Sequence, residues 1–160
     1  AVHTLKQKNI PGGIVEAGGD LQVIGTKQGK PWKIGIQHPR KKNDLAATLT
    51  LHDDDSVATS GDYQRFRMHN GKRYHHIIDP GTGFPSRSGL ISVSVIAKDP
   101  VLADAWATAL FVMGTEKGIN LLKKNPHIQA VFITSEFTMM ASHELKERVH
   151  VFDIEHVKWF

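Results

Sequence analysis

The chain contains no cysteine among its 160 residues. This absence excludes disulfide bonds, thiolate metal sites and thiol catalysis, and it leaves the cellular compartment open. The chain also lacks internal repeats and any run of about 18 apolar residues, so the sequence predicts no transmembrane helix. We expect one globular domain, because 160 residues without repeats are enough to bury a real core.

A large excess of charge of one sign is also missing. Lys and Arg number 20 against 16 Asp and Glu, which gives a net charge of +4. Such an excess favours anionic ligands only mildly, and without a dense basic patch it does not indicate a nucleic-acid partner. With 40% hydrophobic and 22% charged residues, the composition is that of a globular chain and excludes disorder.

The sequence begins at Ala1, without an initiator Met and without a signal peptide. Its first residues, up to Lys6, already have the character of a helix interior. The breakers from Asn9 to Gly13 then end this helix. We therefore expect the sequence to be part of a longer chain.

One predicted helix organises the interpretation of the rest. Asp99 is placed to cap it, Pro100 occupies its first position and Gly114 ends it. Within it, Asp104 and Thr108 stand four residues apart, so one helix face presents a carboxylate beside a hydroxyl. Mg²⁺ binds such hard oxygen donors while keeping sites for water and substrate phosphate. Spacing alone favours a simpler interpretation, a buried helix whose Asp and Thr hydrogen-bond to their surroundings.

Strand-like segments dominate the middle of the chain, and helices cluster late. Gly18 and Gly19 interrupt the first segment, which indicates a bulge or a place where backbone or ligand comes close. This order of elements favours an α+β fold with a largely antiparallel sheet and packed helices. The predicted strands cover residues 14–24, 32–37, 48–51, 56–59, 90–97, 128–134 and 149–152, and a short second helix covers 116–124.

The dipeptide Asn70-Gly71 is the strongest hairpin signal in the sequence. A two-residue turn there pairs residue 69 with 72, 67 with 74 and 65 with 76. One face of the hairpin would then carry Arg65, Arg67, Tyr74 and His76, and the other Phe66, Met68, Arg73 and His75. A turn one residue longer would reverse this assignment.

Two adjacent histidines, His75 and His76, stand close to Asp79. Because successive strand residues point to opposite faces, the pair cannot chelate one ion from a regular strand. Either histidine could transfer protons, with its tautomer fixed by a nearby carboxylate. A partly buried histidine satisfied by the backbone is an equally weighted alternative. The segment from Thr59 to Tyr63 is likewise either a plain turn or a ligand loop.

Three blocks of residues follow one another along the chain. They are Gly18–Asp20 with Pro31–Ile36, then Thr59–Tyr63 with His76–Pro85, then Ala103–Ala109. In this order and spacing they closely resemble the ApbE family of flavin transferases. The resemblance runs from Ala1 to about Thr134 and matches only the C-terminal half of a family member.

The resemblance implies a T-fold-like α+β architecture with FAD as substrate and a dependence on Mg²⁺. It implies transfer of FMN from FAD to a Thr or Ser hydroxyl of an acceptor protein with release of AMP. Some members instead hydrolyse FAD to FMN and AMP. Such proteins usually sit on the outer face of the bacterial cytoplasmic membrane, and we expect the lipid anchor in the N-terminal half, outside this sequence.

By resemblance, Asp104 and Thr108 correspond to metal ligands, and His76 to the base for the acceptor hydroxyl. A metal that bridges phosphate oxygens would neutralise the charge that develops as the FAD pyrophosphate is cleaved. Further residues fall in motifs that line the flavin-nucleotide cleft: Gly18, Gly19, Asp20, Ser60, Gly61, Asp62 and Thr82.

Two departures from the family pattern stand against this. Gly81 replaces a basic residue that family members often carry in that loop, and the N-terminal half with its glycine-rich Lys-Gly motif is not in this sequence. That motif normally supplies cleft wall and a backbone metal ligand. The alternatives are a flavin-binding protein of the same fold without turnover and a basic binding module without flavin.

Overall fold

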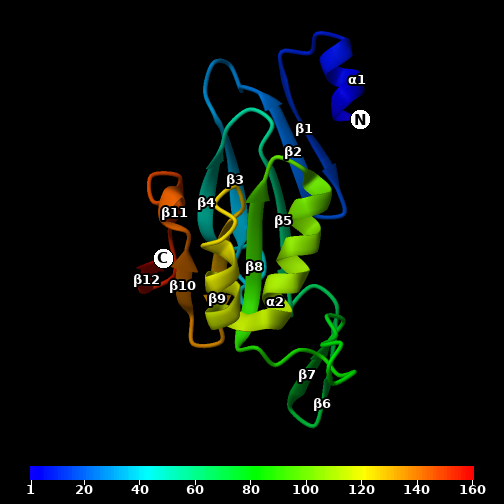
Figure 1. Cartoon of the computed structure of the whole chain (residues 1–160), viewed down its shortest axis with the longest axis vertical. Helices are drawn as coiled ribbons and strands as arrows, with labels where there is room; N and C mark the ends of the chain where they lie inside the picture. Colours follow the sequence, from blue (N-terminus) through cyan, green and yellow to red (C-terminus); the bar gives the residue numbers. More distant parts are fainter.

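The computed structural model describes all 160 residues, which form three stacked layers (Figure 1). The first sheet comprises β1 (Gly12–Ala17), β2 (Asp20–Gly25), β5 (Ser56–Gly61), β8 (Leu90–Ala97), β9 (Gln129–Thr134), β10 (Thr138–Ala141) and β12 (His156–Trp159). The second comprises β3 (Trp32–Gln37), β4 (Leu45–Leu51) and β11 (Val149–Val151). The remaining elements are the β6 (Phe66–His69) and β7 (Lys72–His75) hairpin, helices α1 (Val2–Gln7) and α2 (Pro100–Leu122), and the 3-10 turn η1 (His143–Leu145).

The seven-stranded sheet has the order β1-β2-β5-β8-β9-β10-β12 and lies between α2 and the three-stranded sheet β11-β4-β3. All its neighbouring strands are antiparallel except β10 and β12. The predicted α+β fold with a largely antiparallel sheet and packed helices is therefore confirmed.

Strand β8 is buried along its whole length, because a layer covers each of its faces. Val93 and Val95 pack into the core beneath α2. Ile91 and Ile96 belong to the other core, between the two sheets. Removing a side chain of this size from water contributes about 1.5–3 kcal/mol, so both layers are held to the same strand.

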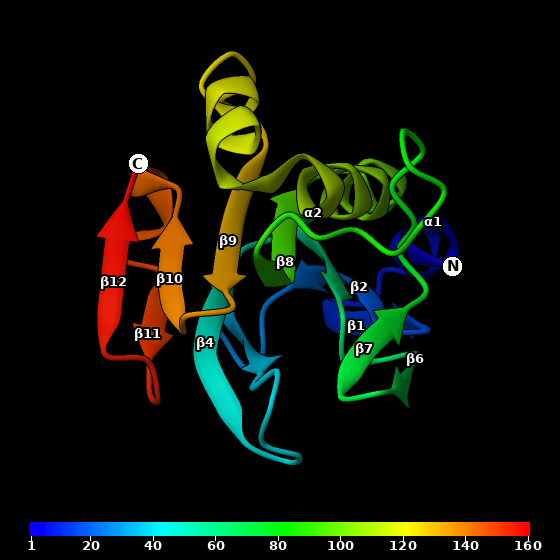
Figure 2. The same ribbon diagram turned by 90° about the horizontal axis from the view of Figure 1, so that it is seen from below.

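Helix α2 starts and breaks where the sequence predicts. The Asp99 side chain accepts a hydrogen bond from the Val101 amide at 2.8 Å. Gly114 has φ 78° and ψ 178°, so a second helical segment continues from it in a different direction (Figure 2). A Cβ at position 114 would also lie 3.3 Å from the Ser88 carbonyl oxygen. No helix in the chain, α2 included, combines the length and apolar character needed to cross a membrane.

The predicted hairpin is present, whereas the single strand predicted over residues 14–24 is in fact a second hairpin. The β6–β7 register pairs Arg67 with Tyr74, as a two-residue Asn70-Gly71 turn requires, so this prediction is confirmed. The Gly18-Gly19 pair is not a bulge: with φ of 70° and 105°, the two glycines form the turn that joins β1 to β2. Positive φ values of this kind are what tight hairpin turns demand and what glycine adopts without strain.

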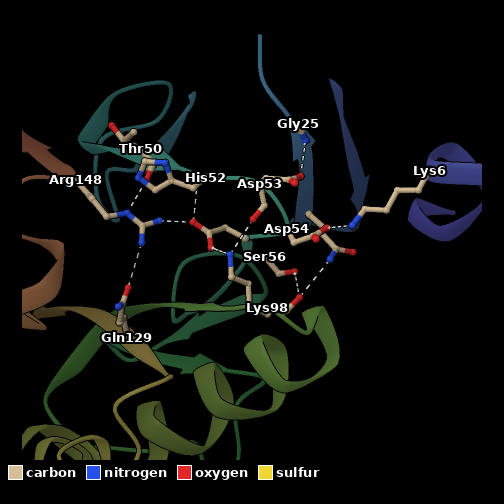
Figure 3. A network of polar contacts seen from close by, with 12 residues as sticks. Lys6, Gly25, Thr50, His52, Asp53, Asp54, Ser56, Lys98, Gln129 and Arg148 are labelled. Atoms are coloured by element: carbon tan, nitrogen blue, oxygen red, sulfur yellow. Dashed lines mark hydrogen bonds and ion pairs between the residues drawn. The ribbon is translucent and has the colours of Figure 1, made fainter. Parts of the chain in front are cut away.

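A buried ion cluster around Asp55 ties the layers together (Figure 3). Asp55 lies between β4 and β5 and is 5% exposed. Its carboxylate accepts hydrogen bonds from the His52 amide and from Lys98 Nζ, both at 2.9 Å, and it pairs with Arg148. Arg148 also donates to the Gln129 side chain of β9 at 3.4 Å. Three separate segments of the chain therefore meet at one carboxylate, and Arg148 links them to β9.

The charge of Asp55 makes the fold sensitive to acid. Burial by itself would raise the pKa of the Asp55 carboxyl, but the His52 amide, Lys98 and Arg148 together hold that pKa below 3.8. A carboxyl whose pKa is lower in the folded chain than in the unfolded one stabilises the fold above its unfolded pKa. That stabilisation is lost as the pH falls through the folded-state pKa.

We expect Asp55→Asn to lower the free energy of unfolding by about 3 kcal/mol at pH 7, because Arg148 and Lys98 lose their buried partner. The measurement is urea unfolding of both proteins between pH 7 and pH 3. The difference should stay constant down to about pH 5 and shrink at lower pH, where the wild-type carboxylate is itself protonated.

Asp54→Asn is the matched control. Asp54 pairs with Lys6 on the surface, where 39% and 45% of the two side chains are exposed. Its loss should change the free energy of unfolding by less than about 0.5 kcal/mol. Equal stabilities of the wild type and Asp55→Asn at pH 7 would contradict the role of the cluster.

Candidate functional site

The predicted metal ligands lie on the first half of α2, beside the ridge that packs on the sheet. Ala103 and Ala107 are fully buried, and Asp104 and Thr108 each follow one of them on an exposed face of the helix. The simpler interpretation took α2 to be a buried helix. In the structure, the face that carries Asp104 and Thr108 is exposed. The Thr108 hydroxyl lies 3.0 Å from the Ser60 hydroxyl, so β5 and α2 present two oxygens together.

A second carboxylate joins Asp104 from another element. Asp20, the first residue of β2, lines the same cavity of about 460 Å³ as Asp104. Burial raises the pKa of the Asp20 carboxyl, and the negative charges of Asp104 and Glu16 raise it further. All ion pairs of the chain lie elsewhere. The cavity therefore holds two carboxylates without a positive partner.

These donors fit Mg²⁺ better than a transition metal. No group of three or more His, Cys, Asp and Glu side chains in the chain is arranged to hold a metal ion. Zn²⁺ sites in proteins are built from a group of His and Cys side chains, which supply nitrogen and sulfur ligands. Mg²⁺ needs only one or two protein carboxylates, because water and substrate phosphates complete its shell. Asp104 with the Thr108 hydroxyl is a donor set of that kind, and Asp20 adds negative charge.

The segment from Ser60 to Tyr63 turns out of β5 and is held firmly. Ser60 is 8% exposed and faces Thr108. A Cβ at Gly61 would lie 2.4 Å from the Tyr63 ring, so only glycine lets that ring fold back. Asp62 is 7% exposed and accepts two hydrogen bonds from Arg40, at 2.6 and 2.7 Å. Of this predicted trio, only Ser60 is brought into contact with a predicted metal ligand.

Arg40 is a partner of Asp62 that no motif in the sequence indicates. It lies in the loop between β3 and β4 and forms a bidentate pair with Asp62, while Arg73 of β7 lies 3.8 Å from the same carboxylate. The Arg73 guanidinium also stacks 3.8 Å above the Phe66 ring. Arg40 and Asp62 are 22 positions apart in the sequence, and no sequence pattern connects them. Only the three-dimensional structure shows that Asp62 binds both Arg40 and Arg73 of the hairpin.

The adjacent histidines have opposite environments. His75 is 8% exposed, donates from Nε2 to the Ser86 carbonyl at 3.0 Å and packs edge-on against Phe111. Its Nδ1 is buried without a partner. His76 is exposed, and its Nδ1 lies 3.3 Å from the Arg65 carbonyl oxygen. Because a carbonyl only accepts, Nδ1 of His76 carries the proton and Nε2 keeps a free lone pair.

The remaining predicted residues lie in exposed turns. Thr82 belongs to the turn between Asp79 and Phe84, where its amide donates to the Asp79 carbonyl at 3.2 Å. Its hydroxyl accepts from the Phe84 amide at 3.3 Å. Gly18 and Gly19 occupy the β1–β2 turn with open space around them. The fold thus brings Asp20 to the cavity of Asp104 and Ser60 to Thr108, and it leaves His76, Thr82 and the two glycines in separate segments. The nucleotide-binding and catalytic roles stay predictions.

Comparison with known proteins identifies the family. The sequence model of the ApbE family matches residues 1–132. The FAD:protein FMN transferase of Treponema pallidum (strain Nichols) is 38% identical over 165 residues, which span 98% of this chain and 46% of that protein. Flavin transferase ApbE from Vibrio cholerae superposes with a TM-score of 0.78 at 33% identity over 92% of this chain and 47% of its own.

The ApbE protein of Thermotoga maritima superposes with a TM-score of 0.76 at 42% identity, over 86% of this chain and 44% of its own. The chain therefore spans about half the length of the relatives that it matches. Sequence model, relatives and solved structures agree, and the chain belongs to the ApbE family.

Proposed function

We propose that the protein to which this chain belongs is a Mg²⁺-dependent FAD:protein FMN transferase. It would move FMN from FAD to a Thr or Ser hydroxyl of an acceptor protein and release AMP. The observation that carries the proposal is that successive turns of α2 present Asp104 to a cavity that Asp20 also lines, and Thr108 to the Ser60 hydroxyl. A relative named FAD:protein FMN transferase matches 98% of the chain at 38% identity, which supports it.

Asp104 and Thr108 would hold the Mg²⁺ ion, with the Asp20 carboxylate at the same cavity. When bound there, the ion neutralises negative charge on the phosphate oxygens of FAD. A cation also relieves the repulsion that raises the pKa of the Asp20 carboxyl. The Ser60 hydroxyl restrains Thr108 from the side of the sheet, since the two oxygens lie 3.0 Å apart.

His76 would remove the proton from the acceptor hydroxyl. The Arg65 carbonyl fixes the proton on Nδ1, so Nε2 is the basic atom and it lies on an exposed side chain. The hydroxyl oxygen attacks the FMN phosphorus, and the bond from that phosphorus to the bridging oxygen of AMP breaks. The hydroxyl proton passes to Nε2, and AMP leaves with the bridging oxygen. Water in place of the hydroxyl would give hydrolysis of FAD to FMN and AMP.

The test uses the protein as its gene encodes it, incubated with FAD, Mg²⁺ and a candidate acceptor protein. Covalent flavin fluorescence on the acceptor in a denaturing gel, together with AMP in equal amount, is the expected result. AMP and free FMN without labelled acceptor would indicate a hydrolase. Stoichiometric FAD binding without either product would indicate a flavin-binding protein and overturn the proposal.

For the metal ligands, we expect Asp104→Ala to weaken Mg²⁺ binding and to lower turnover by about 100-fold or more, because the ion loses its charged ligand. Thr108→Val should be milder, since it removes a neutral ligand and keeps the shape. The measurement is the rate of AMP release against Mg²⁺ concentration. Glu116→Ala, an exposed carboxylate on the second segment of α2, is the control. Wild-type activity of a folded Asp104→Ala protein at low Mg²⁺ would refute the assignment.

For the base, we expect His76→Asn to slow FMN transfer by about 10²- to 10⁴-fold, the usual contribution of a general base. The FAD affinity should change far less, because the proton is removed only in the transition state. Initial transfer rates and FAD titrations measure the two effects separately. His127→Asn, an exposed histidine before β9, is the control and should leave both unchanged. A transfer rate within a few-fold of wild type would show that His76 is not the base.

A further inference from the structure

His75 and His76 stand where two strand pairings meet. The β6–β7 ladder ends with the pair of Phe66 and His75. The chain bends at His76 and then pairs again, through a bridge between Ile78 and Pro85. The direction in which the His76 ring points is therefore set by how this bend is held.

The His76 ring has few restraints of its own. The amide and the ring Nδ1 of His76 both donate to the Arg65 carbonyl, at 3.1 and 3.3 Å. A hydrogen bond of 3.3 Å is long and contributes weakly. The proton on Nδ1, which leaves Nε2 free as a base, depends on this bond. It therefore depends on where the backbone places the ring.

The His75 side chain fastens the two sides of the bend together. Its Nε2 donates to the Ser86 carbonyl at 3.0 Å, and this bond is buried. The Ser86 amide donates to the Ile77 carbonyl at 2.9 Å. In a regular antiparallel ladder, the Ile77 amide would donate back to the Ser86 carbonyl. The His75 ring supplies the donor in its place, so the residue before the bend is bound to a residue after it.

Stability alone does not explain a histidine at position 75. The side chain is buried and packs edge-on against Phe111, with ring centroids 5.5 Å apart. Its Nδ1 is buried and receives no hydrogen bond. A leucine would fill the space beside Phe111 without burying an unpaired nitrogen. What the imidazole adds here is the N–H at Nε2, so the need that His75 meets is a donor directed at Ser86.

We propose that His75 is a positioning residue for His76. The bond from His75 to Ser86 holds the bend so that the His76 ring meets the Arg65 carbonyl through Nδ1 and keeps Nε2 as the basic atom. The inference rests on the proposed function, because it takes His76 as the base. Misplacing a reacting group by about 1 Å can lower a rate by about 100-fold, so loss of this bond should slow the reaction by about tenfold or more.

Substitutions at position 75 separate the donor from the bulk of the ring. The amide nitrogen of Gln lies as many bonds from Cβ as the imidazole Nε2, whereas the amide nitrogen of Asn lies as many bonds away as Nδ1. His75→Gln can therefore keep the bond to Ser86, and His75→Asn and His75→Leu cannot. Urea unfolding establishes that each variant is folded. Should His75→Leu fail to fold, the comparison of Gln with Asn carries the test.

The first measurement is the rate of AMP release from FAD by the protein as its gene encodes it, with Mg²⁺ and the acceptor protein present. We expect His75→Asn and His75→Leu to lower kcat by about tenfold or more with the KM for FAD nearly unchanged, and His75→Gln to recover most of the rate. In a His76→Asn background the same substitutions should cause no further loss, because the group that they position is gone. Equal kcat values for the Gln, Asn and Leu variants, or an additive loss in that background, would overturn the proposal.

The competing explanation is that His75 acts on the metal ligands. Its neighbour Phe111 lies on α2, about one turn after Thr108. The rate of AMP release against Mg²⁺ concentration separates the two roles. Positioning of His76 leaves the midpoint of this dependence where the wild type has it. A higher Mg²⁺ requirement in His75→Leu or His75→Asn would show that the effect passes through α2, and the proposal would be wrong.

The last measurement does not require activity. Heteronuclear NMR of the imidazole nitrogens distinguishes the two neutral tautomers at about pH 8, where an ordinary imidazole is uncharged. The signals that disappear in His76→Asn belong to His76. We expect the proton on Nδ1 in the wild type and in His75→Gln, and a mixture of tautomers in His75→Asn and His75→Leu. One tautomer in all four proteins would refute the role of His75. If the wild type releases no AMP, the proposed function fails, while this spectrum still tests the positioning of His76.

Discussion

Burial of β8 on both faces is the constraint on which the rest of the structure depends. Because α2 covers one face and the three-stranded sheet the other, every residue of β8 is inside the protein. Strand β5 pairs beside it with Ser60 opposite Val93, and Val93 packs toward α2. Because cross-strand partners share a face, the pairing of β5 with β8 orients Ser60 toward α2 and Thr108. The packing of the core therefore determines the orientation of a site residue.

The electrostatics of the chain divide into charges that are neutralised inside and charges that are left free. Asp55 and Asp62 are buried, and each is held by two cationic side chains that come from distant segments. Asp20 and Asp104 have no such partner. An excess of negative charge at a cavity is what a protein needs to bind a cation.

Local signals in the sequence were sufficient wherever one residue type decides the backbone. Asp99 and Gly114 marked the ends of a helix segment, and Asn70-Gly71 set the register of the hairpin. Two strands near the C-terminus, β10 and β12, escaped prediction; β12 joins the sheet by a parallel pairing to β10 that passes over η1 and β11. Long-range contacts of this kind leave no periodic trace.

The candidate site shows the same division. The spacing of Asp104 and Thr108 follows from helix geometry and was readable from the sequence. The approach of Asp20, 84 positions before Asp104, was not, since it depends on how β2 is placed beside α2. Equally, the sequence assigned opposite faces to His75 and His76, but not which of them would be inside. Burial of Phe111 decides this, because it gives His75 an apolar neighbour.

The break at Gly114 has a consequence for how the chain can change over evolution. In a continuous helix, an inserted or deleted residue rotates everything on one side relative to the other by about 100°. The non-helical dihedral angles of Gly114 interrupt this mechanical link, so the rotational phase of the second segment is set anew. Length changes after Gly114 can be absorbed there, while Asp104 and Thr108 keep their orientation toward the cavity and β5.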